Sequence, residues 1–167
     1  MLFAVIGAMR GWAKEIMVTF SVILALFLIS VLENYVPVVK NILAKAGPAS
    51  LFWMRAILVL LLAFFGYQTP NIRGLAGPRF ARERLQDTLL GLLVGAFNGY
   101  LIFGTLWFYM DQAGYPYPKL IMPPVPGSQV AQQTANMMKW MPPAYLLPPW
   151  IYFAVGISFL FVIIVFL

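Results

Sequence analysis

Long apolar runs without a charged side chain constrain the fold of this chain more than any other feature. The clearest extends from Thr88 to Met110 and is closed by Asp111. A helix needs about 20 such residues to cross the hydrocarbon core of a bilayer. It can do so because a helix satisfies its own backbone hydrogen bonds, which lipid cannot. This run therefore predicts a transmembrane helix.

Three further apolar runs accompany it, and together they predict an all-α, polytopic membrane protein with about four transmembrane helices. The predicted spans cover residues 16–32, 51–67, 88–110 and 150–167. Composition agrees, because 62% of the 167 residues are hydrophobic and 10% are charged, against about 25% charged residues in soluble domains.

Residues 112–149 differ from the spans and predict a proline-rich, aromatic extracytoplasmic segment. Nine of the thirteen prolines lie between Asp111 and Pro149, and proline interrupts regular helix. Residues 128–141 are free of proline and can form an amphipathic helix. This segment separates two membrane regions. Residues 1–111 contain the first three predicted spans, and residues 150–167 are predicted to form a C-terminal transmembrane helix.

Small residues on the third span predict close helix packing. Gly91, Gly95 and Gly99 are each four apart and share one helix face, where another helix can approach closely. Asn98 lies beside them and is expected to form a hydrogen bond to a neighbouring helix. A contact with a ligand is the alternative for Asn98.

Charged residues gather at the ends of the spans. Residues 68–87 are expected to be a cytoplasmic basic loop, with both termini on its side of the membrane. Its basic residues are Arg73, Arg79, Arg82 and Arg84. Arg55 is expected to reach the interface beside Trp53, with a buried ion pair as the alternative. The carboxylates at the span ends are expected to be solvated; they are Glu15, Glu33, Asp87 and Asp111.

Several functional classes are disfavoured by residues that the chain does not contain. The sequence has no cysteine and no histidine, which removes the commonest general base and the commonest metal ligands. We expect no catalytic site, no metal and no cofactor. The net charge of +6 suits anionic lipid better than nucleic acid, since the basic residues flank apolar runs. The expected partners are the lipid bilayer and other membrane proteins, in a hetero-complex or a homo-oligomer.

The most distinctive short segment contains Gly7, Arg10, Gly11, Lys14 and Glu15. Two glycines four apart and three charges crowd the start of the first span. The pattern indicates a helix break at the membrane interface, held by anchoring charges.

This segment resembles the Gly-x-x-Arg-Gly-x-x-Arg/Lys-Glu signature of the CvpA family, the colicin V production membrane proteins. A second block, from Asp87 to Gly99, resembles the family's Asp-x-x-x-Gly-x-x-x-Gly-Ala-x-x-Gly pattern. The resemblance covers residues 1–111. It implies a small multipass protein of the bacterial inner membrane, without an established biochemical activity. The family generally has a full span before its Arg-Gly pair, where this chain has nine residues before Arg10, and often has arginine where Asn98 stands.

The leading hypothesis is a non-enzymatic, CvpA-like membrane protein that acts through assembly with other membrane proteins. An accessory or scaffolding subunit of a large photosynthetic or respiratory complex is the alternative. A channel or transporter is disfavoured, because the middle of each predicted span lacks ionisable residues and the sequence shows no inverted repeat. A membrane enzyme is the least favoured class.

Overall fold

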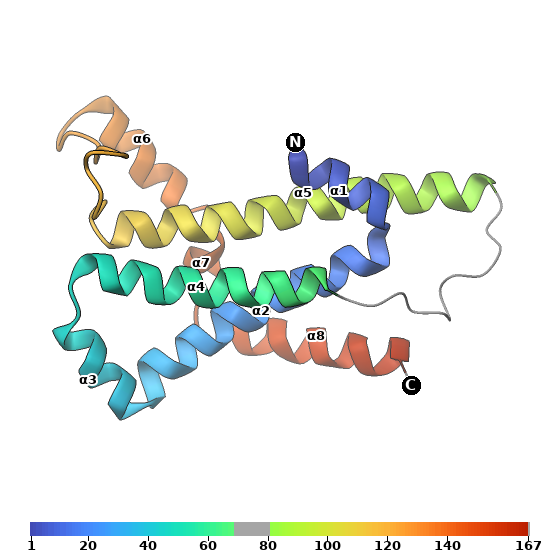
Figure 1. The fold of residues 1–167 in the computed structure, drawn as a ribbon, viewed down its shortest axis with the longest axis horizontal. Coiled ribbons are helices and arrows are strands. Elements are labelled where there is room, and N and C mark those ends of the chain that lie inside the picture. Colours follow the sequence, from blue (N-terminus) through green and yellow to red (C-terminus); the bar gives the residue numbers. More distant parts are fainter. Residues whose placement is uncertain (69–80, 167) are drawn as a thin grey trace.

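The structure is a computed structural model that describes residues 1–68 and 81–166. The described residues form helices joined by turns, with no strand among them (Figure 1). The helices are α1 (Leu2–Arg10), α2 (Trp12–Tyr35), α3 (Pro37–Lys45), α4 (Pro48–Tyr67), α5 (Ala81–Gln112), α6 (Gln129–Met138), α7 (Pro142–Tyr145) and α8 (Trp150–Phe166).

Three of these helices are long and apolar enough to cross a membrane. They are α2, α4 and the part of α5 from Arg84 to Gln112, with 24, 20 and 29 residues. Each contains one of the first three predicted spans and extends beyond it. The fourth predicted span corresponds to α8, which has 17 residues and is shorter than the other three. The all-helical fold is therefore confirmed for the described residues, and three of its helices have the length and composition to cross a membrane.

The link between the first two spans contains a helix that hydropathy did not predict. Helix α3 begins at Pro37 and ends at Lys45. Proline is well suited to this first helical position, where its missing N–H has no partner to lose. Pro48 starts α4 in the same way.

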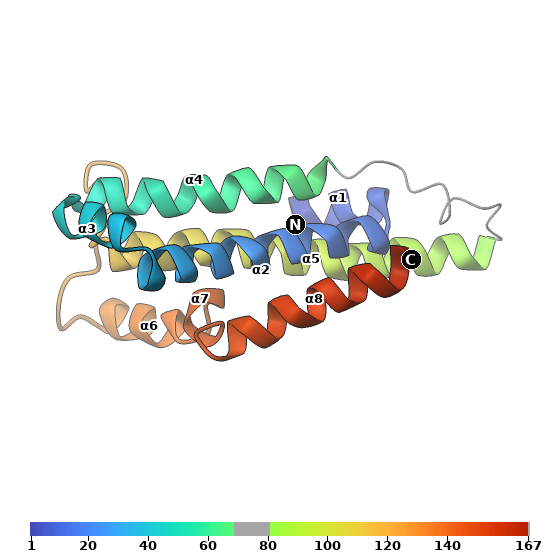
Figure 2. The same cartoon turned by 90° about the horizontal axis from the view of Figure 1, so that it is seen from below.

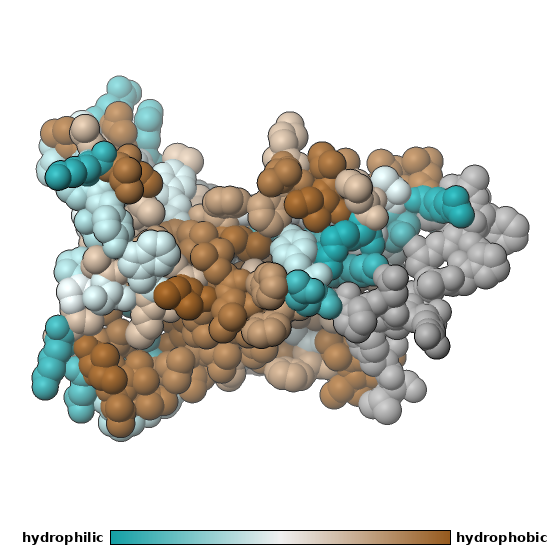
Figure 3. Space-filling view, viewed as in Figure 1, coloured by the Kyte–Doolittle hydropathy of each residue, from teal (hydrophilic) through white to brown (hydrophobic). Residues whose placement is uncertain are grey.

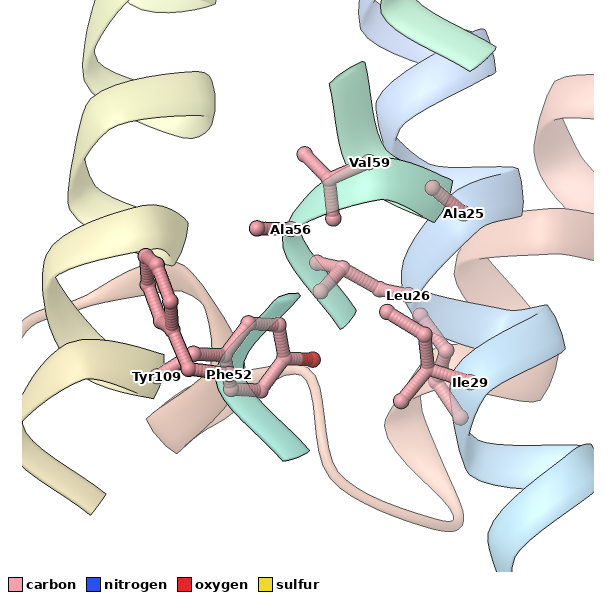
Figure 4. Close-up of a cluster of buried hydrophobic side chains, with 8 residues drawn as sticks. Ala25, Leu26, Ile29, Phe52, Ala56, Val59 and Tyr109 are labelled. Atoms are coloured by element: carbon pink, nitrogen blue, oxygen red, sulfur yellow. The ribbon is translucent and has the colours of Figure 1, made fainter. Parts of the chain in front are cut away.

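Helix α2 lies at the centre of the bundle and contacts α4, α5 and α8. Figure 4 shows the core that they share, where Leu26 and Ile29 of α2 meet Phe52 and Val59 of α4. Tyr109 of α5 and Ile151 of α8 complete this cluster. Small residues on the facing helices, Ala25 and Ala56, permit the close approach.

The proline-rich segment folds back toward the bundle. Ser128 caps α6, since its side-chain oxygen accepts a hydrogen bond from the Ala131 N–H at 3.1 Å. Further on, the Tyr100 hydroxyl donates to the Trp140 carbonyl, and Pro142 contacts Gly104. Tyr100 and Gly104 belong to the predicted third span, so the end of this segment lies beside the apolar part of α5.

The surface matches a bundle surrounded by lipid. In the view of Figure 3, hydrophobic residues cover the middle of the molecule and hydrophilic residues gather toward its ends. Large exposed side chains such as Ile57 and Phe64 on α4, and Leu93 and Phe103 on α5, contribute to the apolar surface.

Candidate functional site at the break between the first two helices

The break between α1 and α2 depends on a glycine. Gly11 has φ 84° and ψ 155°, a conformation that side-chain-bearing residues avoid. Space excludes a side chain as well, because a Cβ atom there would lie 2.7 Å from both carboxylate oxygens of Asp87. Asp87 also accepts a hydrogen bond from the Trp12 N–H at 3.3 Å. The predicted break is thus built against α5.

Helix α1 turns back at this break and packs along α5, as Figure 1 shows. Glycines meet at the contact: a Cβ atom on Gly7 would lie 2.8 Å from the Cα atom of Gly95, and one on Gly99 would lie 3.0 Å from the Cβ atom of Phe3. A Cβ atom on Gly91 would likewise lie too close to the backbone of Gly7. The predicted packing face of α5 is therefore occupied by α1 of the same chain.

A buried group of polar side chains, here named the Glu15 cluster, lies beside the break. It consists of Arg10, Glu15, Thr19 and Asn98. The Glu15 side chain has no exposed surface. Its Oε1 accepts from Arg10 Nη1 at 2.8 Å, and its Oε2 accepts from Asn98 Nδ2 at 2.9 Å. Asn98 Nδ2 also lies 2.8 Å from the Glu15 carbonyl, and Thr19 Oγ1 donates to Asn98 Oδ1 at 2.6 Å.

Arg10 connects the Glu15 cluster to α4. Its Nη2 donates to the Tyr67 carbonyl at 2.8 Å, and its guanidinium carbon lies 4.6 Å from the centre of the Tyr67 ring. The last carbonyls of a helix lack partners inside the helix and carry partial negative charge, so an arginine here is favourable. One side chain thereby joins α1 to the ends of α2 and α4.

The expectation that Glu15 is a solvated boundary marker is wrong. The break folds α1 over α5, and the start of α2 is enclosed between them and α4. A carboxylate can remain charged in such a place only with a counter-charge and hydrogen-bond donors, which Arg10 and Asn98 supply. The sequence signal was the pair of opposite charges on either side of Gly11.

A second polar group lies at the opposite end of the bundle. Arg55 makes a two-pronged ion pair with Glu33, at 2.6 Å from Nε and 3.0 Å from Nη2. Its Nη1 donates to the Gln112 side chain at 2.8 Å, and its guanidinium carbon lies 5.0 Å from the Tyr109 ring centre. Arg55 thus makes the ion pair of the alternative interpretation, but the pair is partly exposed and not buried. A cavity of about 160 Å³ adjoins the pair, and Pro143 and Leu146 contribute to its lining.

The remaining predicted residues are basic side chains outside the two groups defined above. Lys14 is partly exposed on α2, and Arg84 is exposed on α5. Arg73 and Arg79 fall outside the described residues, as does the side chain of Arg82. The structure therefore brings together the signature segment and the glycine block, and does not place the basic loop.

The Glu15 cluster is suited to holding helices rather than to chemistry. Its carboxylate is engaged by an arginine and an amide, which leaves it poorly placed to accept a proton from a substrate. In the described part of the chain, no group of three His, Cys, Asp or Glu side chains has the arrangement to hold a metal ion.

No family model, curated protein or solved structure matches this chain. The resemblance to the CvpA family rests on the residues of the two motifs.

Proposed function

We propose that this chain is a CvpA-like multipass protein of the bacterial inner membrane that acts by assembly with other membrane proteins. One observation supports this proposal above others: the two motifs of the resemblance meet face to face. The segment from Gly7 to Glu15 packs on the block from Asp87 to Gly99, and glycine lies against glycine at their contact. Motifs far apart in sequence that form one interface are reasonably treated as one structural unit.

A role in assembly is supported by how the polar groups are used. The Glu15 cluster and the Arg55–Glu33 pair both hold helices of this chain together. Large apolar side chains, by contrast, cover the outward faces of α4 and α5. Such faces are open to lipid and to the helices of other membrane proteins, where packing drives association.

The proposal includes four membrane crossings, with α8 as the last. Its 17 residues extend about 26 Å at 1.5 Å per residue, close to the roughly 30 Å of a hydrocarbon core. Figure 2 shows α8 running beside α2, which it contacts. With both termini and the basic loop in the cytoplasm, α3 and α6 are extracytoplasmic, and the end of the proline-rich segment around Pro142 returns to lie against the apolar part of α5.

Purification from native membranes tests the proposed assembly. The protein, tagged and expressed at its natural level, is extracted in mild detergent, and the co-purifying proteins are quantified by mass spectrometry. We expect stoichiometric partner proteins or a defined homo-oligomer. A stoichiometric set of redox or pigment proteins would identify the accessory-subunit form of the proposal.

Two results would overturn it. A protein that is monomeric and without partners, both in detergent and after crosslinking in the membrane, does not act by assembly. Selective solute flux through liposomes that contain the purified chain alone would instead favour a channel or transporter.

A further inference from the structure

We propose that the groove between α2, α4 and α8 binds one acyl chain of an anionic phospholipid, with the head group at the end where α2 begins. This lipid site is independent of the proposed assembly. The groove lies between α4 and α8, which both contact α2. Ring pairs fix α8 on α2, with Phe20 5.3 Å from Phe161 and Phe27 6.0 Å from Tyr152 between ring centres.

The groove has the dimensions of a ligand site. Its volume is about 350 Å³, within the roughly 300–1,000 Å³ that is usual for small-molecule pockets. Along α2 it extends from Met17 to Leu24, about 12 Å of helix at 1.5 Å per residue. A partner helix is about 10–12 Å wide, so a single turn of it occupies roughly 420–610 Å³. An extended hydrocarbon chain fits this space better than a helix does.

The polar atoms in the groove already have partners, which favours hydrocarbon as the occupant. The Ser21 hydroxyl donates to the Met17 carbonyl, and the Ser158 hydroxyl donates to the Ala154 carbonyl, both at 2.8 Å. Gly66 completes the floor, where a Cβ atom would lie 2.9 Å from the Ser21 Cβ atom. Apolar side chains from three membrane helices form the walls; they include Leu24, Leu62, Phe65, Val155, Phe159 and Val162.

Charge at one end of the groove selects the head group. Lys14 lies three residues before Met17 and therefore on the same face of α2. Arg10 donates a hydrogen bond to the carbonyl of Tyr67, which follows Gly66 in the sequence. Residues 10–15 and 84–87 together contain three Lys or Arg residues and two Asp or Glu residues. Such an excess of positive charge attracts anionic phospholipids to a membrane surface.

Native mass spectrometry of the full chain tests this site. The protein is reconstituted in nanodiscs with equal amounts of phosphatidylglycerol and phosphatidylcholine and is then released into mild detergent. We expect one retained phospholipid per chain, with phosphatidylglycerol at least five-fold enriched. Ser158→Phe, which fills the groove, should reduce retention at least five-fold.

Matched variants separate the acyl-chain site from the head-group site. Gly156→Phe adds the same side chain two residues away, where a Cβ atom meets nothing within 4 Å, and should retain the lipid. Lys14→Gln should retain one lipid but bring the two head groups near parity. Val162→Phe fills the groove from another position, and thermal unfolding in detergent verifies that the filled variants remain folded.

The proposal is overturned if the unaltered protein retains no phospholipid. It is also overturned if folded Ser158→Phe and Val162→Phe proteins retain as much lipid as Gly156→Phe. Enrichment of phosphatidylglycerol that Lys14→Gln leaves unchanged would contradict the placement of the head group.

Discussion

Among single residues, Glu15 depends most on its neighbours, because its carboxylate is wholly buried beside a partly buried Arg10. Removing one partner of a buried ion pair typically costs about 3–5 kcal/mol, since the other charge is left without compensation. We expect Glu15→Gln and Arg10→Gln each to lower the free energy of unfolding by about 3 kcal/mol. The double variant should lower the free energy of unfolding by much less than the sum of the two single effects. Unfolding by dodecyl sulfate in mixed micelles measures all three.

The exposed Lys40 provides the control for this cycle. Lys40→Gln is expected to change stability by less than about 0.5 kcal/mol, as surface substitutions usually do. Strict additivity of the Glu15 and Arg10 variants, within about 0.5 kcal/mol, would mean that the two side chains do not interact.

At Arg55, the shape of the side chain matters as well as its charge. Its planar guanidinium contacts both Glu33 oxygens and Gln112 at once, whereas a lysine ammonium cannot reproduce that fork. The pair is about one-fifth exposed, so solvent screening reduces its strength. We expect Arg55→Lys to cost about 1–2 kcal/mol, between exposed and buried ion pairs. The same micelle unfolding assay would contradict this if Arg55→Lys matched the unaltered protein.

At the scale of helices, the contact of α1 with α5 depends on the absence of side chains. A leucine at position 95 would enter the backbone of α1, because even its Cβ atom would lie 2.8 Å from the Gly7 Cα atom. We expect Gly95→Leu to displace α1. Since the chain lacks cysteine, Ala4→Cys can report this: Ala4 is buried, so its thiol should react with a maleimide only in the Gly95→Leu background.

Two further variants calibrate that measurement. Gly156→Leu places the same side chain in open space on α8 and should leave Ala4→Cys protected. Val5→Cys, on the exposed side of α1, should react in every background. Protection of Ala4→Cys in the Gly95→Leu protein would show that α1 tolerates the leucine.

How far these helices could be predicted from sequence depended on the kind of signal. Uncharged apolar runs located α2, α4 and α5, because hydropathy reflects the solvent around a helix. The small-residue spacing of Gly91 and Gly95 identified a packing face but not its occupant, which lies far away in the sequence. The burial of Glu15 was missed for a related reason: charges at a span end look alike whether water or another helix covers them.

At the scale of the whole molecule, three long helices separate two polar ends. Because α2 and α4 run in opposite directions, Lys45 lies at the end of the bundle opposite Gln86. We expect Lys45→Cys and Gln133→Cys to be labelled by an impermeant maleimide in intact cells, and Gln86→Cys only after permeabilisation. Labelling of Lys45→Cys and Gln86→Cys from the same side would contradict the membrane-spanning arrangement.

The pairing of Gly7 with Gly91 also governs the order of biosynthesis. These residues are roughly 80 positions apart, and a ribosome adds about 5–20 residues per second. Helix α1 thus waits on the order of ten seconds for its binding surface to be synthesised. Throughout that interval its glycine face and Arg10 must be sheltered elsewhere, at the translocon or among lipid head groups. Helix α1 is synthesised before α5 but reaches its place only after α5 has followed.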